Sequence, residues 1–227
     1  MKVKICGVTL EGDAARIAAL GVDYIGLNFW PRSKRFVDVE RAAALAAAAR
    51  GAGPAQIVGV FVDATAAEIA AIHARVGLDV IQLHGAEPPE VAGAIAGAAG
   101  RPVWKALAAG GPDALDALDA WLDALDAWPD ACPVDAILLD TPTPERGGSG
   151  RTFDWALARA ARLRHPARRL VLAGGLHPGN VAGAITAVAP WAVDVASGVE
   201  AAPGVKDVGK VAAFVAAARE AGASAGP

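Results

Sequence analysis

The sequence predicts an α/β fold in which one domain forms a (β/α)8 barrel, the TIM-barrel architecture. Three observations support this prediction: eight short apolar runs recur along the chain, an Ala- and Leu-rich segment with helical spacing follows each run, and polar or glycine residues cluster where the runs end. Strands that alternate with helices form right-handed βαβ units, and eight units in 227 residues close into a barrel more readily than they open into a doubly wound sheet. No Gly-x-Gly-x-x-Gly follows the first run, which disfavours a dinucleotide-binding fold.

The expected strands are rich in Val, Ile and Leu without strict polar alternation, as is typical of strands buried on both faces. They cover residues 2–6, 24–29, 57–62, 80–83, 103–107, 136–140, 170–173 and 192–195. The expected helices cover residues 11–20, 38–50, 64–76, 88–98, 112–127, 153–163, 178–188 and 206–218. Glycines at 21, 77 and 100 are expected to end helices, and prolines at 88, 112 and 178 to begin them.

The domain is expected to span residues 1–227, with a frayed tail from about residue 221. The segment 114–130 carries a near-repeat of Ala-Leu-Asp, with leucines on one side of a helix. An amphipathic barrel helix with a solvated Asp face explains this repeat better than a low-complexity interaction helix does. The whole chain therefore reads as one barrel.

Composition narrows the range of partners and compartments. Hydrophobic residues make up 54% of the chain and its net charge is -3, which offers no electrostatic footprint for nucleic acid or an anionic membrane. Cys6 and Cys132 lie far apart without Cys-x-x-Cys spacing, so neither a disulfide framework nor a zinc site is indicated. The first residues enter a strand pattern at once, and no apolar run reaches the roughly 20 residues of a membrane helix. We therefore expect a cytoplasmic protein without membrane or nucleic-acid partners, as a monomer or homodimer.

Cys6 and Asp140 are the candidate proton-transfer residues. Each ends an apolar run, and the carboxyl ends of barrel strands form the rim where such enzymes do chemistry. Lys4, two residues before Cys6 on the same side of the strand, is a cation that favours the thiolate. A buried apolar cysteine and a turn-capping aspartate are the alternatives. Cys132 precedes the sixth strand at the opposite rim and is interpreted as structural.

Glycine pairs after the last two strands predict a phosphate site. Gly174 and Gly175 follow the seventh strand, and Ser197 and Gly198 follow the eighth. Glycines let backbone N–H groups approach an oxyanion, and these two loops commonly grip phosphate in barrels. Gly147 and Gly148 lie in the glycine-rich segment 145–150, which we expect to order on ligand binding and to contribute to phosphate binding.

Other polar residues at strand ends are candidate substrate contacts. Arg35 could bind a carboxylate in fork geometry, although a solvated charge run is the default for its loop. His84 is interpreted as a hydrogen-bonding wall residue, because four histidines without clustered carboxylates do not indicate a metal centre. Lys105 is a core or rim cation, and Asp194 either bonds a ligand or neutralises Lys105. His73, His165 and His177 receive no role.

Eight motifs occur in order along nearly the whole chain, and together they resemble the phosphoribosylanthranilate isomerase family. They are Lys4-Ile5-Cys6-Gly7-Val8-Thr9, Gly26-Leu27-Asn28-Phe29 with Ser33-Lys34-Arg35, Gly59-Val60-Phe61-Val62, Gln82-Leu83-His84-Gly85, Leu138-Leu139-Asp140-Thr141, Gly147-Gly148-Ser149-Gly150 with Thr152-Phe153-Asp154-Trp155, Leu172-Ala173-Gly174-Gly175-Leu176, and Val193-Asp194-Val195-Ala196-Ser197-Gly198-Val199-Glu200. Two departures from the family pattern are Ala196, where Asn or Ser is usual, and an expanded segment between Lys105 and Asp140.

The resemblance implies an Amadori rearrangement of a phosphoribosyl substrate, without metal or other cofactor. It implies a general base at Cys6, a general acid at Asp140, a carboxylate-binding Arg35 and a substrate contact from Asp194. Two other readings stay open: another sugar-phosphate isomerase or epimerase on the same barrel, and a non-catalytic phosphate-metabolite sensor or scaffold, which would bind ligand without converting it.

Overall fold

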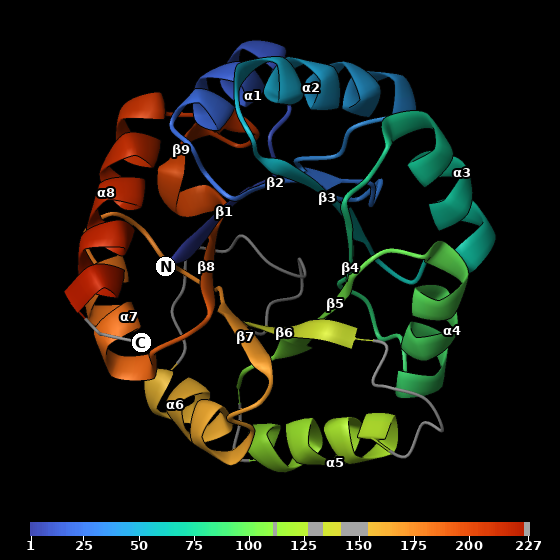
Figure 1. Ribbon diagram of the computed structural model, residues 1–227, viewed down its shortest axis with the longest axis vertical. Coiled ribbons are helices and arrows are strands. Elements are labelled where there is room, and N and C mark those ends of the chain that lie inside the picture. The colour runs from blue at the N-terminus through green and yellow to red at the C-terminus, as the bar shows by residue number, and fades with distance from the viewer. Residues whose placement is uncertain (111–112, 127–133, 142–153, 225–227) are drawn as a thin grey trace.

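The computed structural model describes residues 1–110, 113–126, 134–141 and 154–224, and its eight parallel strands close into a barrel in chain order (Figure 1). The strands are β1 (Lys2–Cys6), β2 (Tyr24–Asn28), β3 (Gln56–Phe61), β4 (Val80–Leu83), β5 (Val103–Ala108), β6 (Val134–Asp140), β7 (Arg169–Leu172) and β8 (Ala192–Val195). β1 pairs with both β2 and β8, which closes the ring. The predicted (β/α)8 barrel is confirmed.

Helices surround the barrel as an outer ring in Figure 1. They are α1 (Glu11–Ala19), α2 (Val39–Ala52), α3 (Ala66–Val76), α4 (Pro89–Ala99), α5 (Ala114–Asp126), α6 (Trp155–Arg164), α7 (Val181–Val188) and α8 (Val208–Ser224). In α5, Leu118, Leu122 and Leu125 are buried, as the amphipathic interpretation of this segment predicts. This ring covers the outward faces of the strands, so both faces of the sheet are buried.

Helix ends agree with the sequence in part. Gly77 and Gly100 end α3 and α4 in the left-handed conformation, as predicted. Pro178 does not begin α7, because a turn closed by the Asn180 backbone N–H on the His177 carbonyl oxygen comes first and the helix starts at Val181. At the other end of the chain, α8 continues through Ser224, so residues 221–224 are helical where a frayed tail was expected.

An aromatic cluster fills the amino-terminal end of the barrel. Tyr24 and Trp104 meet edge to face with ring centroids 4.8 Å apart, and Trp104 and Trp191 do the same at 5.8 Å. Tyr24 and Trp104 lie at or near the starts of their strands, and Trp191 immediately precedes β8. These ring contacts pack the amino-terminal end of the barrel with aromatic side chains.

A short insertion follows β8 that the sequence patterns did not predict. It consists of the 3-10 turn η1 (Ser197–Val199) and an antiparallel hairpin of β9 (Glu200–Ala202) and β10 (Val205–Lys206). The backbone of Gly204, between the two strands, has a positive φ of 83°. Thr9 donates its hydroxyl hydrogen to the Gly204 carbonyl oxygen at 2.6 Å, which fixes the hairpin over the loop after β1. None of the helices in the described segments is long and apolar enough to cross a bilayer.

Candidate active site

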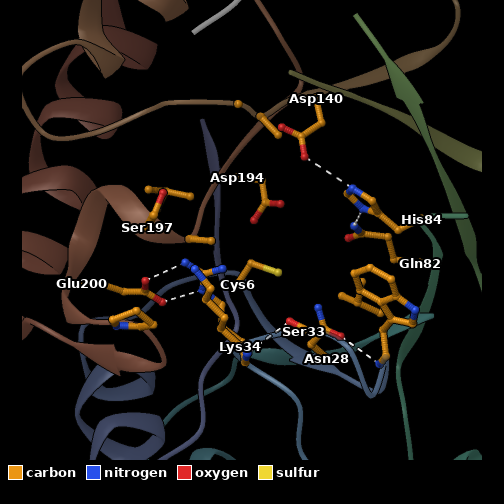
Figure 2. Close-up of a pocket in the computed structure, with 18 of the residues that line it drawn as sticks. Cys6, Asn28, Ser33, Lys34, Gln82, His84, Asp140, Asp194, Ser197 and Glu200 are labelled. Carbon is orange, nitrogen blue, oxygen red and sulfur yellow. Dashed lines mark hydrogen bonds and ion pairs between the residues drawn. The ribbon is translucent and has the colours of Figure 1, made fainter. Parts of the chain in front are cut away.

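A cavity of about 610 Å³ lies at the carboxyl ends of the strands. Cys6 and Asp140 both line it, from β1 and β6, and Figure 2 shows their side chains directed into the same hollow. The other predicted residues that line the cavity are Arg35, His84, Gly174, Gly175, Asp194 and Ser197. The structure therefore brings together residues that the sequence spreads over nearly two hundred positions.

Four residues that the sequence analysis singled out need separate mention. Gly147 and Gly148 lie outside the described residues, as does Cys132. Gly198 is not among the residues that line the cavity. A Cβ at Gly198 would lie 2.9 Å from the carbonyl carbon of Leu176, so this glycine allows the loops after β7 and β8 to pack against each other.

The surroundings of Cys6 include Gly26, which has no side chain, and the buried Lys4. Gly26 pairs with Cys6 across β1 and β2, and a Cβ there would lie 2.8 Å from the Cys6 sulfur. Burial raises the pKa of the Cys6 thiol, the charge of Lys4 opposes that rise, and Asp194 adds to it. The pKa of Cys6 therefore lies above its ordinary value. The predicted cation, Lys4, is present, but burial and the charge of Asp194 outweigh its effect.

Asp194 pairs with Lys4 and not with Lys105. Lys4 Nζ donates to Asp194 Oδ2 at 2.9 Å, and the lysine side chain has no exposed surface. The second carboxylate oxygen, Oδ1, is buried and has no hydrogen-bond partner among the described residues. Lys105 instead donates to Glu87 Oε2 at 2.7 Å and to the Gly85 carbonyl oxygen at 2.8 Å. Asp194 therefore offers one free acceptor to a ligand in the cavity.

Gln82 on β4 and His84 just after it form a row of contacts that reaches Asp140. Its Oδ1 accepts the backbone N–H of Thr141 at 2.8 Å, and its Oδ2 lies 3.4 Å from His84 Nε2. Gln82 Nε2 lies 2.8 Å from His84 Nδ1, and Gln82 is 1% exposed. The Gln82 amide therefore holds the imidazole ring so that its Nε2 faces Asp140. Figure 2 shows the three side chains in a row at one side of the cavity.

Arg35 is held by an acidic side chain of the hairpin. Its Nε and Nη2 donate to the two carboxylate oxygens of Glu200, each at 2.7 Å. Lys206 Nζ donates to the same carboxylate at 2.8 Å. Burial opposes ionisation of Glu200, but the hydrogen bond from Arg35 and the charge of Lys206 outweigh it and hold the pKa of Glu200 below its ordinary value. The hydrogen bond to Glu200 also raises the pKa of Arg35.

The loops after β7 and β8 present backbone to the cavity. Gly174 and Gly175 have positive φ angles of 79° and 65°, a conformation that favours glycine. Asn180 Nδ2 donates to the Gly175 carbonyl oxygen at 3.1 Å, and Ser197 begins η1 on the other side. Successive N–H groups in such turns form anion-binding concavities. This geometry suits the phosphate that the glycine pairs predict.

Three residues that shape the site had no role in the sequence analysis. Gln82 lies two residues before His84, and Gly26 lies opposite Cys6 in the strand register. Glu200 lies 165 residues from Arg35 in sequence. The strand period of two is a signal that could have coupled Gln82 to His84. Among the described residues, no group of three or more His, Cys, Asp or Glu side chains is arranged to hold a metal ion.

The fold and the site together define a (β/α)8-barrel enzyme in which a thiol, a carboxyl group and two glycine-containing loops share one cavity. A family model described as N-(5'phosphoribosyl)anthranilate isomerase matches residues 3–217. The N-(5'-phosphoribosyl)anthranilate isomerase of Myxococcus xanthus is 43% identical over 219 residues, which cover 96% of this chain and 96% of that protein. The chain belongs to the N-(5'-phosphoribosyl)anthranilate isomerase family.

Solved structures agree with this assignment. The phosphoribosyl anthranilate isomerase of Thermotoga maritima is 40% identical with a TM-score of 0.83, and the match covers 97% of this chain and 99% of that one. A second phosphoribosyl anthranilate isomerase, 35% identical with a TM-score of 0.78 and the same coverage, was solved in complex with reduced 1-(o-carboxyphenylamino)-1-deoxyribulose 5-phosphate.

Proposed function

We propose that this chain converts N-(5-phosphoribosyl)anthranilate into 1-(2-carboxyphenylamino)-1-deoxyribulose 5-phosphate, a step of tryptophan biosynthesis, with Asp140 as general acid and Cys6 as general base. The observation that supports these roles is the presence of the thiol and the carboxyl group in one cavity, on strands at opposite sides of the barrel. An acid and a base on two sides of a pentose can act on neighbouring atoms of the sugar.

The reaction is an Amadori rearrangement. Asp140 donates a proton to the furanose ring oxygen as the bond between this oxygen and C1 breaks, and the nitrogen lone pair forms an iminium with C1. Cys6, as thiolate, then removes the proton from C2, and the electron pair of that C–H bond neutralises the iminium to give an enolamine. The enolamine gains a proton at C1 and loses its hydroxyl proton to become the ketone. Because the substrate nitrogen is the electron sink, these steps need no added electron acceptor.

The remaining predicted residues bind the two ends of the substrate. Backbone N–H groups around Gly174, Gly175 and Ser197 are proposed to hold the phosphate, with Gly198 shaping that loop. Gly147 and Gly148 stay proposed phosphate contacts on the sequence alone. Binding energy from the distant phosphate fixes the reacting carbon between acid and base.

Arg35, His84 and Asp194 are proposed to hold the anthranilate carboxylate and the sugar hydroxyls. Glu200 takes the Nε and one Nη2 hydrogen of Arg35, which leaves further guanidinium N–H donors for a substrate carboxylate. Asp194 Oδ1, without a partner among the described residues, suits a sugar hydroxyl.

Loss of anthranilate fluorescence on mixing the substrate with pure protein tests the activity. We expect turnover by the parent protein, and Cys6→Ala and Asp140→Asn should each lower it by about 10²-fold or more, the scale of a lost acid or base. Tight binding without conversion by the parent would favour a metabolite sensor. Parent-like turnover in either variant would remove that residue from its role.

We further propose that the enzyme acts in the cytoplasm as a monomer or homodimer, on a small phosphoribosyl substrate and without nucleic-acid or membrane partners. The net charge of -3 and the lack of a cysteine pattern for disulfides support this setting. Light scattering after size-exclusion chromatography measures the mass of the assembly. A mass above that of two chains would contradict the proposed assembly.

A further inference from the structure

The ionisation of Cys6 raises a question that the proposed acid–base roles leave open. The thiol must lose its proton before it can remove one from the substrate, yet burial raises its pKa. A thiolate in this position has to be stabilised by groups already built into the barrel. The charged groups that interact with Cys6 are Lys4 on β1, Asp194 on β8, Lys206 on β10 and Arg35 in the loop after β2, and Glu200 on β9 is paired with the last two.

Lys206 and Arg35 both bind the Glu200 carboxylate. Lys206 Nζ donates to Glu200 Oε1 at 2.8 Å and to the Ala196 carbonyl oxygen at 3.0 Å. Arg35 forms the two-bond contact with the same Glu200 carboxylate. The negative charge of Glu200 therefore offsets part of the positive charge that these two side chains present to Cys6.

Lys4 is also paired with a carboxylate, Asp194, but its charge lowers the pKa of Cys6 more than that of Lys206 does. It points into the barrel on the same strand face as Cys6, because side chains two residues apart share a face. A Cβ at Gly26 would lie 3.2 Å from Lys4 Cε and 2.8 Å from the Cys6 sulfur, so one glycine makes room for both side chains. Lys4 has no exposed surface and keeps a raised pKa: burial lowers it, but Asp194 and Cys6 outweigh burial. Its ammonium group therefore stays charged at neutral pH.

Resting on the proposed function, we infer that Lys4 is a positioning residue for the reaction: its buried ammonium group, anchored by Asp194 Oδ2, stabilises the Cys6 thiolate. Asp194 Oδ2 holds the ammonium group at 2.9 Å, and Lys4 Cε and the Cys6 sulfur lie 3.2 and 2.8 Å from the same point, the Cβ position of Gly26, so the two side chains are neighbours. A buried cation next to a thiol favours the ionised form of that thiol. Because the Lys4 side chain has no exposed surface, it acts through Cys6 and not by its own contact with the substrate.

The thiolate absorbance of Cys6 at 240 nm, titrated against pH, tests the inference without any substrate. The background is Cys132→Ser, so that Cys6 is the sole thiol in the chain. In Lys4→Met we expect the midpoint to rise by about one to three pH units, the usual effect of losing a close opposite charge. We also expect kcat/KM to be lost at neutral pH and to recover as pH rises. An unchanged midpoint in folded Lys4→Met would overturn the inference.

Two control variants separate charge from structural damage. Lys2→Met removes another lysine from the same face of β1, where Lys2 pairs with Asp23 at 2.9 Å. Lys105→Met breaks another buried pair, with Glu87 at 2.7 Å. Both should leave the Cys6 midpoint within a few tenths of a pH unit of the parent. A shift as large as that of Lys4→Met in either control would count against a specific role of Lys4.

A pair of variants answers the question if Lys4→Met does not fold. Asp194→Asn leaves Lys4 without its anion, and the double variant Lys4→Met with Asp194→Asn removes the buried charges together, a change that proteins often tolerate. The midpoint in the double variant should exceed that in Asp194→Asn by about one pH unit or more. Equal midpoints would refute the role of Lys4. Because these titrations need no turnover, a parent protein that fails to isomerise the substrate would contradict the proposed function and leave the Lys4 inference intact.

Discussion

Gly26 faces Cys6 across the parallel pairing of β1 and β2, and the space where a Cβ would project from Gly26 is occupied by the Cys6 sulfur, 2.8 Å away. The thiol therefore occupies space that exists because its neighbour lacks a side chain. A contact this close cannot be relieved by a flexible side chain alone, since the Cys6 Cα lies at 3.1 Å from the same point.

Gly26→Ala should lower kcat by about ten- to a hundredfold, because displacing a reacting group by an ångström has an effect of that size. Overpacking should also reduce the free energy of unfolding by about 1–3 kcal/mol. Gly97→Ala is the matched control, because nothing lies within 4 Å of a Cβ at that helical site. It should keep the parent kcat and stabilise the protein slightly. Steady-state kinetics and urea unfolding measure both effects, and parent-like kcat in Gly26→Ala would contradict the steric account.

Gly174→Ala should affect both stability and activity. The residue has a φ of 79°, and a Cβ there would lie 2.7 Å from the Thr141 nitrogen and 3.1 Å from Asp140 Oδ1. Gly100 has a φ of 58° with nothing within 4 Å of its Cβ position. Gly100→Ala should therefore show only the backbone cost of about 1–2 kcal/mol, while Gly174→Ala should also lose turnover as the carboxyl group moves. Equal turnover in the two variants would show that Asp140 does not depend on this clearance.

Ser197→Asp should raise KM by about tenfold or more with kcat largely kept at saturation, because a carboxylate in the loop repels the substrate phosphate. Ser197→Ala keeps the backbone N–H groups and should change KM little. Inhibition by inorganic phosphate gives an independent measurement, since it should weaken in parallel in Ser197→Asp. If Ser197→Asp binds phosphate as the parent does, the anion site lies elsewhere.

Loss of the Arg35–Glu200 contact should lower the stability of the protein as the pH falls into the acid range. Because the pKa of Glu200 is lower in the folded protein than in the unfolded chain, its contribution is fully present above the unfolded value of about 4.3 and is lost as pH falls through the folded value. Thermal unfolding from pH 6 to pH 3 should show a Tm that falls less steeply in Glu200→Gln than in the parent. Glu11→Gln is the control, because its pair with Arg41 is exposed and should not alter the slope. Identical slopes in Glu200→Gln and the parent would contradict the prediction.

The positions of the site residues could be predicted because they depend on local pattern. Most of the short apolar runs end at a polar or glycine residue, and barrel closure then places all those ends on one rim, as Cys6 and Asp140 illustrate. Strand bounds agree within two residues for the same reason, since β1, β4 and β8 match their apolar runs completely. The positions of these residues therefore follow from local sequence and barrel closure, and do not depend on which residues far away in the sequence they contact.

The partners of those residues could not be predicted in the same way. Arg35 and Glu200 are 165 positions apart, and Lys4 and Asp194 are 190 apart, so no spacing rule connects them. From the sequence, Asp194 was expected to bond a ligand or to neutralise Lys105. In the barrel, the lysine that pairs with Asp194 is Lys4. The hairpin of β9 and β10 was missed because strands of three and two residues carry no periodic signal.

The bridge between Lys4 and Asp194 joins the first strand of the barrel to the last. A ribosome makes the lysine near the start of synthesis and its aspartate near the end, so the nascent chain holds an ammonium group that has no counter-ion during most of translation. Water must solvate that charge until β8 arrives. The pair therefore forms late, and a truncated product that stops before residue 194 lacks the carboxylate that anchors Lys4 however well its earlier strands associate.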